Sequence, residues 1–185
     1  IQHDCVSVFV KPHYIEPARK ALKDTHIKVV SVIGFPHGGV TTATKMYETQ
    51  DLYQRGADEL ALVINIGAVR DHDDLAVKND IQGVIKTARG KPMTVILEMP
   101  LLNDEEKARA CKLAQAAGAP TLMTATGFAS HNTGTAADVR LIRATCPNLK
   151  IRAAGGIRTQ KDALALIEAG AAWVVLNDIE KTLSE

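Results

Sequence analysis

Seven short apolar runs, rich in β-branched residues, recur along the chain and are separated by stretches of helical character. Most of the runs are continuously apolar and do not alternate with polar residues. Strands that are covered on both faces, as in a parallel sheet, have this pattern. The runs predict strands at residues 6–10, 29–33, 60–64, 94–97, 120–123, 149–152 and 173–176.

Helix start and stop signals fill the stretches between these runs. Residues 103–106 (NDEE) supply an N-cap and an acidic first turn, and residues 159–162 (TQKD) form a weaker version of a capping box. Three Gly-Ala pairs each end a helix shortly before an apolar run, where glycine takes the left-handed conformation. This rhythm predicts alternating β and α elements. The pairs lie at 56–57, 118–119 and 170–171, and the expected helices include 74–88, 103–118, 136–144 and one that begins at Thr159.

Seven such units are one fewer than the eight that close a (β/α)₈ barrel. We therefore expect an α/β fold of the TIM-barrel type, with the first βα unit absent from this chain. No linker or low-complexity stretch divides the sequence, so we expect a single domain over residues 1–185. A doubly wound open sheet is the rival fold. It would place a glycine-rich dinucleotide loop after the first strand, where this chain has Lys11, Pro12 and His13.

Charge and apolar content exclude several classes of protein. With 22 Lys and Arg against 21 Asp and Glu, the net charge is +1, whereas nucleic-acid binding requires a basic surface. No apolar run approaches the roughly 18–20 residues of a membrane span. Three widely spaced cysteines without a CxxC pair indicate a reducing compartment, so we expect a cytoplasmic protein. The expected partner is a small-molecule ligand. Because a barrel that lacks a strand has two open edges, we also expect pairing with another copy or completion by upstream residues.

In a barrel of this type the functional residues lie at the carboxyl ends of the strands. Gly155 and Gly156 join a predicted strand to a helix start. Their exposed backbone N–H groups and the helix N-terminus would form an anion site. Gly127, after Thr124 and Thr126, would add another backbone N–H beside two hydroxyls. The same residues are equally consistent with plain turns.

Motifs over residues 6–175, nearly the whole chain, resemble the deoxyribose-phosphate aldolase family. That family is a (β/α)₈ barrel with one further strand and helix at its start, which would explain the count of seven. The resemblance implies a class I aldolase that splits 2-deoxyribose 5-phosphate into glyceraldehyde 3-phosphate and acetaldehyde through a lysine Schiff base. The motifs are 32–38 (VIGFPHG), 44–45 (TK), 56–60 (GADEL), 63–68 (VINIGA), 96–98 (ILE), 124–128 (TATGF) and 155–159 (GGIRT).

The residues that would perform this chemistry are replaced here. By the resemblance, Met123 stands at the position of the family's Schiff-base lysine. Arg152 stands at the position of a second lysine, and Ala61 at that of the catalytic aspartate. A thioether is not a nucleophilic amine, arginine cannot be deprotonated in a protein, and alanine cannot shuttle protons. The standard class I mechanism is therefore not expected. Other positions are replaced as well. Phe9 stands where the family has a cysteine, and Thr94 stands where it has a further lysine. Residues 175–178 (VLND) stand where the family has a Gly-Thr-Ser-Ser run that holds phosphate.

Another lysine could supply the amine. Lys11 ends the first predicted strand and lies on the same strand face as Phe9, because strand side chains repeat every two residues. Lys150 shares a face with Arg152 but lies deeper, toward the start of its strand. Solvated side chains are the simpler interpretation of both lysines. We interpret Lys45 as structural.

A metal could replace the amine, as in class II aldolases. His37, His72 and His131 fall in loops on the expected active face, with Glu98 near them. No two of these histidines have the HxH or HxxxH spacing of metal ligands. We therefore predict no metal and no cofactor.

Three functional hypotheses follow. The first is a diverged enzyme that acts on a small molecule without an imine. Arg152 would clamp an anionic group and Glu98 or Asp178 would act as acid or base. The second is a non-catalytic protein that binds a ligand or a partner, with an apolar pocket formed by Phe9, Ala61, Met123 and Leu176. The third is an active aldolase with a relocated lysine. Across these hypotheses the expected ligand-binding residues are Gly127, Gly155, Gly156 and Asn177, and the expected pocket residues are Phe9, Lys11, Asn65 and Met123.

Overall fold

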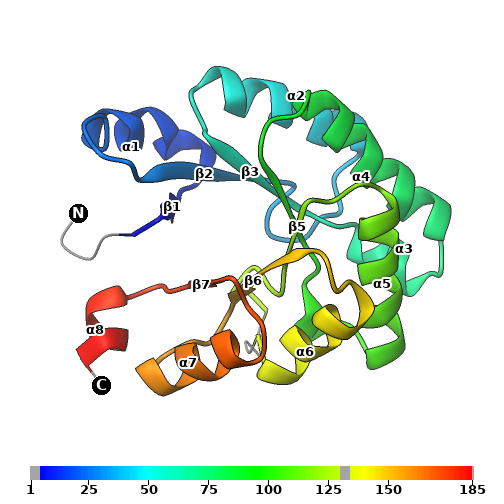
Figure 1. The fold of residues 1–185 in the computed structure, drawn as a ribbon. Coiled ribbons are helices and arrows are strands. Elements are labelled where there is room, and N and C mark those ends of the chain that lie inside the picture. The colour runs from blue at the N-terminus through cyan, green and yellow to red at the C-terminus, as the bar shows by residue number, and fades with distance from the viewer. Residues whose placement is uncertain (1–4, 130–133, 185) are drawn as a thin grey trace.

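The computed structural model describes residues 5–129 and 134–184, and within them seven parallel strands form one sheet. The strands follow one another in chain order, and the sheet curls so that its helices lie on the outside (Figure 1). This confirms the predicted (β/α) barrel type with seven strands where a closed barrel has eight. The strands are β1 (Ser7–Phe9), β2 (Lys28–Ile33), β3 (Glu59–Val63), β4 (Met93–Ile96), β5 (Thr121–Met123), β6 (Lys150–Ala154) and β7 (Trp173–Val175).

The two edges of the sheet are β1 and β7, which each pair with one neighbour among the described residues. Edge strands leave backbone N–H and C=O groups without a ladder partner. These groups could pair with another copy of the chain, which stays a prediction. The cytoplasmic location also stays a prediction. In the described part of the chain, no helix combines the length and the apolar character that a membrane crossing needs.

Helices connect the strands, and the four predicted ones are present. For helix α2 the sequence predicts only the end, at Gly56, because the buried face of this helix carries Lys45 and Thr49 where an amphipathic helix has apolar residues. The α-helices are α1 (Ile15–Ala21), α2 (Thr42–Gln54), α3 (Ile66–Arg70), α4 (Asp74–Ala88), α5 (Asp104–Ala116), α6 (Ala136–Thr145), α7 (Gln160–Glu168) and α8 (Ile179–Ser184). The 3₁₀ helices are η1 (Pro12–Tyr14) and η2 (Met99–Leu101).

Local sequence signals fix where these helices begin and end. The Asn103 side chain accepts a hydrogen bond from Glu106 N at 2.9 Å, and Glu106 accepts one from Asn103 N at 2.8 Å. Thr159 and Asp162 make the same reciprocal pair at the start of α7. Both capping boxes satisfy backbone N–H groups that a helix start leaves free. The three Gly-Ala pairs also end helices as predicted, with φ of +102°, +91° and +110° at Gly56, Gly118 and Gly170.

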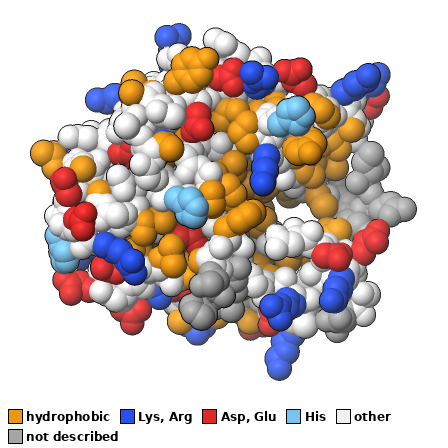
Figure 2. Space-filling view, turned by 180° about the vertical axis from the view of Figure 1, so that it is seen from behind, with side chains coloured by type: hydrophobic (Ala, Val, Ile, Leu, Met, Phe, Trp, Pro, Cys, Tyr) orange, Lys and Arg blue, Asp and Glu red, His pale blue; other side chains and the backbone are white. Residues whose placement is uncertain are grey.

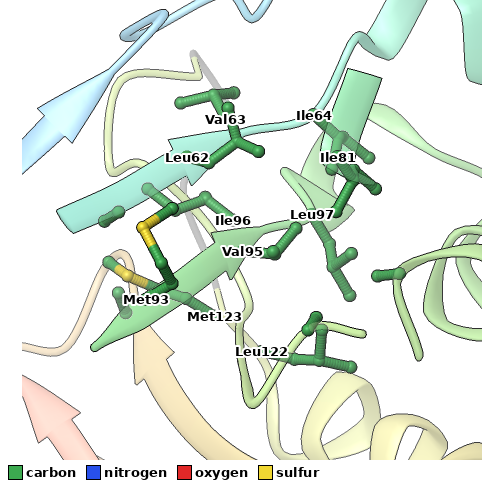
Figure 3. Packing of buried hydrophobic residues seen from close by; sticks show 14 of the residues in the cluster. Leu62, Val63, Ile64, Ile81, Met93, Val95, Ile96, Leu97, Leu122 and Met123 are labelled. Carbon is green, nitrogen blue, oxygen red and sulfur yellow. The ribbon is translucent and has the colours of Figure 1, made fainter. Parts of the chain in front are cut away.

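The core lies between the sheet and the outer helices. Side chains of β3 and β4 that point outward, such as Leu62 and Val95, are fully buried there. Ile81 of α4 belongs to the same cluster as Ile64 and Leu97, and Figure 3 shows these side chains. Each such buried aliphatic side chain contributes about 1.5–3 kcal/mol. The opposite, inner face of the sheet carries Arg152 and Thr94, which contact each other there.

Gly38 cannot carry a side chain without a shift of the backbone. Its φ is +68°, and a Cβ at this position would lie 1.7 Å from the Ile64 carbonyl oxygen. We expect Gly38→Ala to lower the free energy of unfolding by about 3 kcal/mol, from left-handed strain plus this clash. Gly39→Ala is the matched control, because a Cβ there meets nothing within 4 Å. Urea denaturation of both variants checks this, and equal losses of stability would contradict it.

Candidate functional site

A pocket of about 220 Å³ opens at the carboxyl ends of the strands. Figure 2 shows hydrophobic side chains gathered around a hollow on this face of the molecule. The loops after β1, β2, β5, β6 and β7 contribute to its lining, as expected for a barrel. The lining residues are Phe9, Val10, Lys11, Val32, Phe35, Ile96, Met123, Thr126, Gly127, Phe128, Ala154, Gly155, Val175 and Asn177.

One cation and three phenylalanine rings line the pocket, and two of these rings contact each other. The Phe35 and Phe128 rings meet edge to face with their centroids 5.2 Å apart, and Phe128 is 62% exposed. The Lys11 ammonium lies 5.8 Å from the centre of the Phe128 ring. Lys11 is the one ionisable side chain among the described residues that line the pocket. The pocket therefore combines apolar walls with a single positive charge.

Arg152 lies buried on the inner face of the sheet and is not among the lining residues. Its guanidinium makes a bidentate ion pair with Glu59: Nη1 donates to Oε1, and Nη2 donates to Oε2 at 2.9 Å. Thr94 completes the group, because it accepts from Arg152 at 3.1 Å and donates to Glu59 at 2.7 Å. The rings of Phe9 and Trp173 lie over the guanidinium at 5.5 and 5.1 Å. The Glu59 carboxylate therefore already occupies both terminal nitrogens that the predicted clamp would offer to a substrate anion.

The predicted apolar pocket is present, with a different set of walls. Phe9 and Met123 line it, but Ala61 and Leu176 do not. Strand side chains alternate between the two faces of a sheet. Val175 pairs with Ala154 in the ladder and faces the pocket with it, which puts Leu176 on the opposite face.

The two acidic candidates and Asn65 lie outside the pocket lining. Glu98 is 1% exposed; its Oε2 accepts from Thr126 N at 2.7 Å, and its Oε1 has no hydrogen-bond partner among residues 5–129 and 134–184. Asp178 is exposed and accepts from Lys181 N at 3.0 Å at the start of α8. Asn65 caps α3 by accepting from Ala68 N at 3.1 Å. The structure therefore does not bring Arg152, Glu98 and Asp178 together in the pocket.

Three of the four predicted ligand-binding residues line the pocket: Gly127, Gly155 and Asn177. Gly156 follows with φ of +69° but is not a lining residue. At the nearby start of α7, the Asp162 carboxylate accepts from Arg158 N at 3.2 Å and from Thr159 N at 3.0 Å. These backbone hydrogen bonds and the Thr159 side chain lower the pKa of Asp162. A carboxylate of the chain itself thus occupies part of the predicted anion site.

Two further reactive side chains, Cys111 and Lys45, are buried and do not line the pocket. Burial raises the pKa of the Cys111 thiol to about 12, so it stays neutral. The Lys45 ammonium lies 2.5 Å from Asp80 Oδ2 and 3.1 Å from the Val63 carbonyl oxygen. In the described ranges, no group of three or more His, Cys, Asp or Glu could hold a metal ion. His131 lies outside these ranges.

Comparison with known proteins identifies the lineage. A family model described as DeoC/LacD family aldolase matches residues 1–176. The chain belongs to this family. The deoxyribose-phosphate aldolase of Streptococcus equi subsp. zooepidemicus is 46% identical over 170 residues, which are 91% of this chain and 77% of that protein. The deoxyribose-phosphate aldolase of Bacillus cytotoxicus is 43% identical over 187 residues, with 96% of this chain and 83% of the relative covered.

Solved structures of aldolases have the same fold as this DeoC/LacD family member. The aldolase QR15 aligns with a TM-score of 0.86 and 34% identity over 91% of this chain and 76% of its own. The deoxyribose phosphate aldolase of Aeropyrum pernix aligns with a TM-score of 0.86 and 28% identity over 95% of this chain and 75% of its own. The latter is described as having a unique tetrameric structure.

Sequence reasoning missed several residues of this site. Glu59, the partner of Arg152, is the one acid in an otherwise apolar strand, and that position is the signal that could have revealed it. Phe35 and Phe128 lie in two of the motifs that resemble the aldolase family, but their contact joins two loops that are far apart in the chain. No local pattern encodes such a contact.

Proposed function

We propose that this DeoC/LacD family member binds a small molecule in the pocket without forming an imine. The observation that carries the proposal is the side chain at the pocket wall where the resemblance puts the Schiff-base lysine. Met123 has no amine, and Arg152, at the second lysine position, is held in an ion pair with Glu59. Neither side chain can attack a carbonyl carbon.

The pocket nevertheless retains what binding needs. It is concave, it lies where barrels of this type hold their ligands, and apolar side chains dominate its walls. Burial of apolar ligand surface against Phe9, Ile96 and Met123 would supply the affinity. Binding without the family's chemistry accounts both for the kept pocket and for the replaced residues.

A second candidate function is supported by Lys11, which lines the same pocket. In this alternative the Lys11 amine attacks the substrate carbonyl, a C–N bond forms, and water leaves as the imine is made. Lys150 has no such support, because its ammonium lies 5.4 Å over the Trp173 ring and it is not a lining residue.

Borohydride trapping separates the two functions. The protein is incubated with 2-deoxyribose 5-phosphate or with acetaldehyde, reduced, and weighed by intact mass spectrometry. We expect no stoichiometric adduct, because no lysine stands at the family's position. Lys150→Ala is the matched control for Lys11→Ala, since both variants remove the amine of an exposed lysine that adjoins a strand. A single adduct that is lost in Lys11→Ala and kept in Lys150→Ala would refute imine-free binding and establish the second function.

A further inference from the structure

We propose that the ligand of this pocket is a small monocarboxylate with an apolar body, and that Lys11 anchors its carboxylate. This inference rests on the proposed function and adds the chemical class of the ligand. It follows from three properties of the pocket: its charge, the polarity of its walls and its volume.

The charge favours an anion. Lys11 is the one ionisable residue among the described lining residues, and its ammonium stands beside the exposed Phe128 ring. The Lys11 side chain is exposed, and the other described lining residues offer an anion neither a repelling nor a competing charge. Hydrogen bonds between an ammonium and a carboxylate are short and about twice as strong as neutral ones.

The walls favour a hydrocarbon body. Nine of the fourteen lining residues have apolar side chains, and the polar side chains are those of Lys11, Thr126 and Asn177. A sugar phosphate would bring several hydroxyl groups against these walls. Each hydroxyl that loses its water without a new partner costs about 1–3 kcal/mol. An aliphatic or aromatic body loses nothing of this kind and gains from burial.

The surroundings and the volume favour one carboxylate over a phosphate dianion. The backbone N–H groups of Arg158 and Thr159, just before α7, already donate to the Asp162 carboxylate. Asp178 follows the lining residue Asn177 and adds a further negative charge. The volume of about 220 Å³ equals that of about seven water molecules at about 30 Å³ each. An acid of about that many heavy atoms fits, and 3-methylbutanoate is a suitable probe.

The methionines give a site-specific readout. With ¹³C-labelled methionine methyl groups, Met123 reports on the pocket, while Met46 on α2 is an internal control outside its lining. We titrate the protein with 3-methylbutanoate, with its uncharged isostere 3-methylbutanamide, with inorganic phosphate and with 2-deoxyribose 5-phosphate. We expect the acid to shift the Met123 signal at least tenfold more tightly than the amide and than either phosphate, as a charge-assisted hydrogen bond implies.

Lys11 variants test the anchor. Lys11→Met is expected to weaken binding of the acid about tenfold, to the level of the amide, and to leave amide binding unchanged. Lys11→Arg is expected to retain the preference. Lys86→Met, which removes the same charge from an exposed position on α4, is the control and should change nothing.

Each of the remaining outcomes would overturn either the carboxylate inference or the imine-free function. Equal binding of acid and amide, or equal binding of the acid by wild type and Lys11→Met, would overturn the carboxylate inference and leave small-molecule binding intact. Tighter binding of phosphate or of 2-deoxyribose 5-phosphate would overturn it in favour of the family's substrate class. A Met123 signal that no probe shifts would refute the carboxylate inference. A trapped imine at Lys11 would instead refute the imine-free function.

Discussion

Arg152→Met is expected to lower the free energy of unfolding by about 3–5 kcal/mol. The substitution leaves the Glu59 carboxylate, whose side chain is 9% exposed, as an unpaired charge inside the barrel. It also removes the donor to Thr94 and the cation that Phe9 and Trp173 cover. Urea denaturation followed by circular dichroism measures the loss.

Two comparisons show whether the buried charge is the cause. Arg55 pairs with Asp51 at the surface, and the Arg55 side chain is 46% exposed. Arg55→Met should therefore lower the free energy of unfolding by at most about 1 kcal/mol. Adding Glu59→Gln to Arg152→Met removes the stranded charge, and we expect most of the lost stability to return. If Arg152→Met costs no more than Arg55→Met, the pair does not stabilise the fold.

Lys45→Met is the second large effect, and we expect it also to cost about 3–5 kcal/mol. The Lys45 side chain is fully buried and links α2 to α4 through Asp80 and to β3 through the Val63 carbonyl. Methionine fills a similar volume but leaves Asp80 with the Thr42 hydroxyl as its remaining side-chain donor among the described residues. The same urea experiment measures the loss.

The control for this variant is Lys86→Met on the exposed side of α4, which should change stability by less than about 0.5 kcal/mol. The double variant Lys45→Met with Asp80→Asn keeps the hydrogen bond from Thr42 and removes the stranded charge, so it should recover stability. A loss that stays as large in the double variant would point to packing of the lysine stem as the cause.

Much of the fold could be predicted because its signals are local. The strands of the parallel sheet are apolar on both faces, and the capping boxes at Asn103 and Thr159 lie within four residues. Gly118 and Gly170 end helices at their own positions. Helix α2 carried a weak signal, because a lysine and a threonine stand on its buried face.

The pocket could be predicted in part. Strand alternation placed Phe9 and Lys11 on one face, and both line the pocket. The turn glycines at 127 and 155 lie there too, because strands of one parallel sheet end at the same edge. Asn65 and Asp178 follow strands in the same way, but each accepts a hydrogen bond from a backbone N–H at the start of the next helix.

The sequence by itself determined the order of the strands and helices, the family resemblance and the absence of lysine at position 123. Only the tertiary structure decided what Arg152 does. Its partner Glu59 lies 93 residues earlier in the chain, and the two meet because β3 and β6 curl toward each other across the inner face of the sheet. Two charges that leave water must pair with each other. The sequence marks Glu59 as the one acid in an apolar strand, but only the fold shows that Arg152 is its partner.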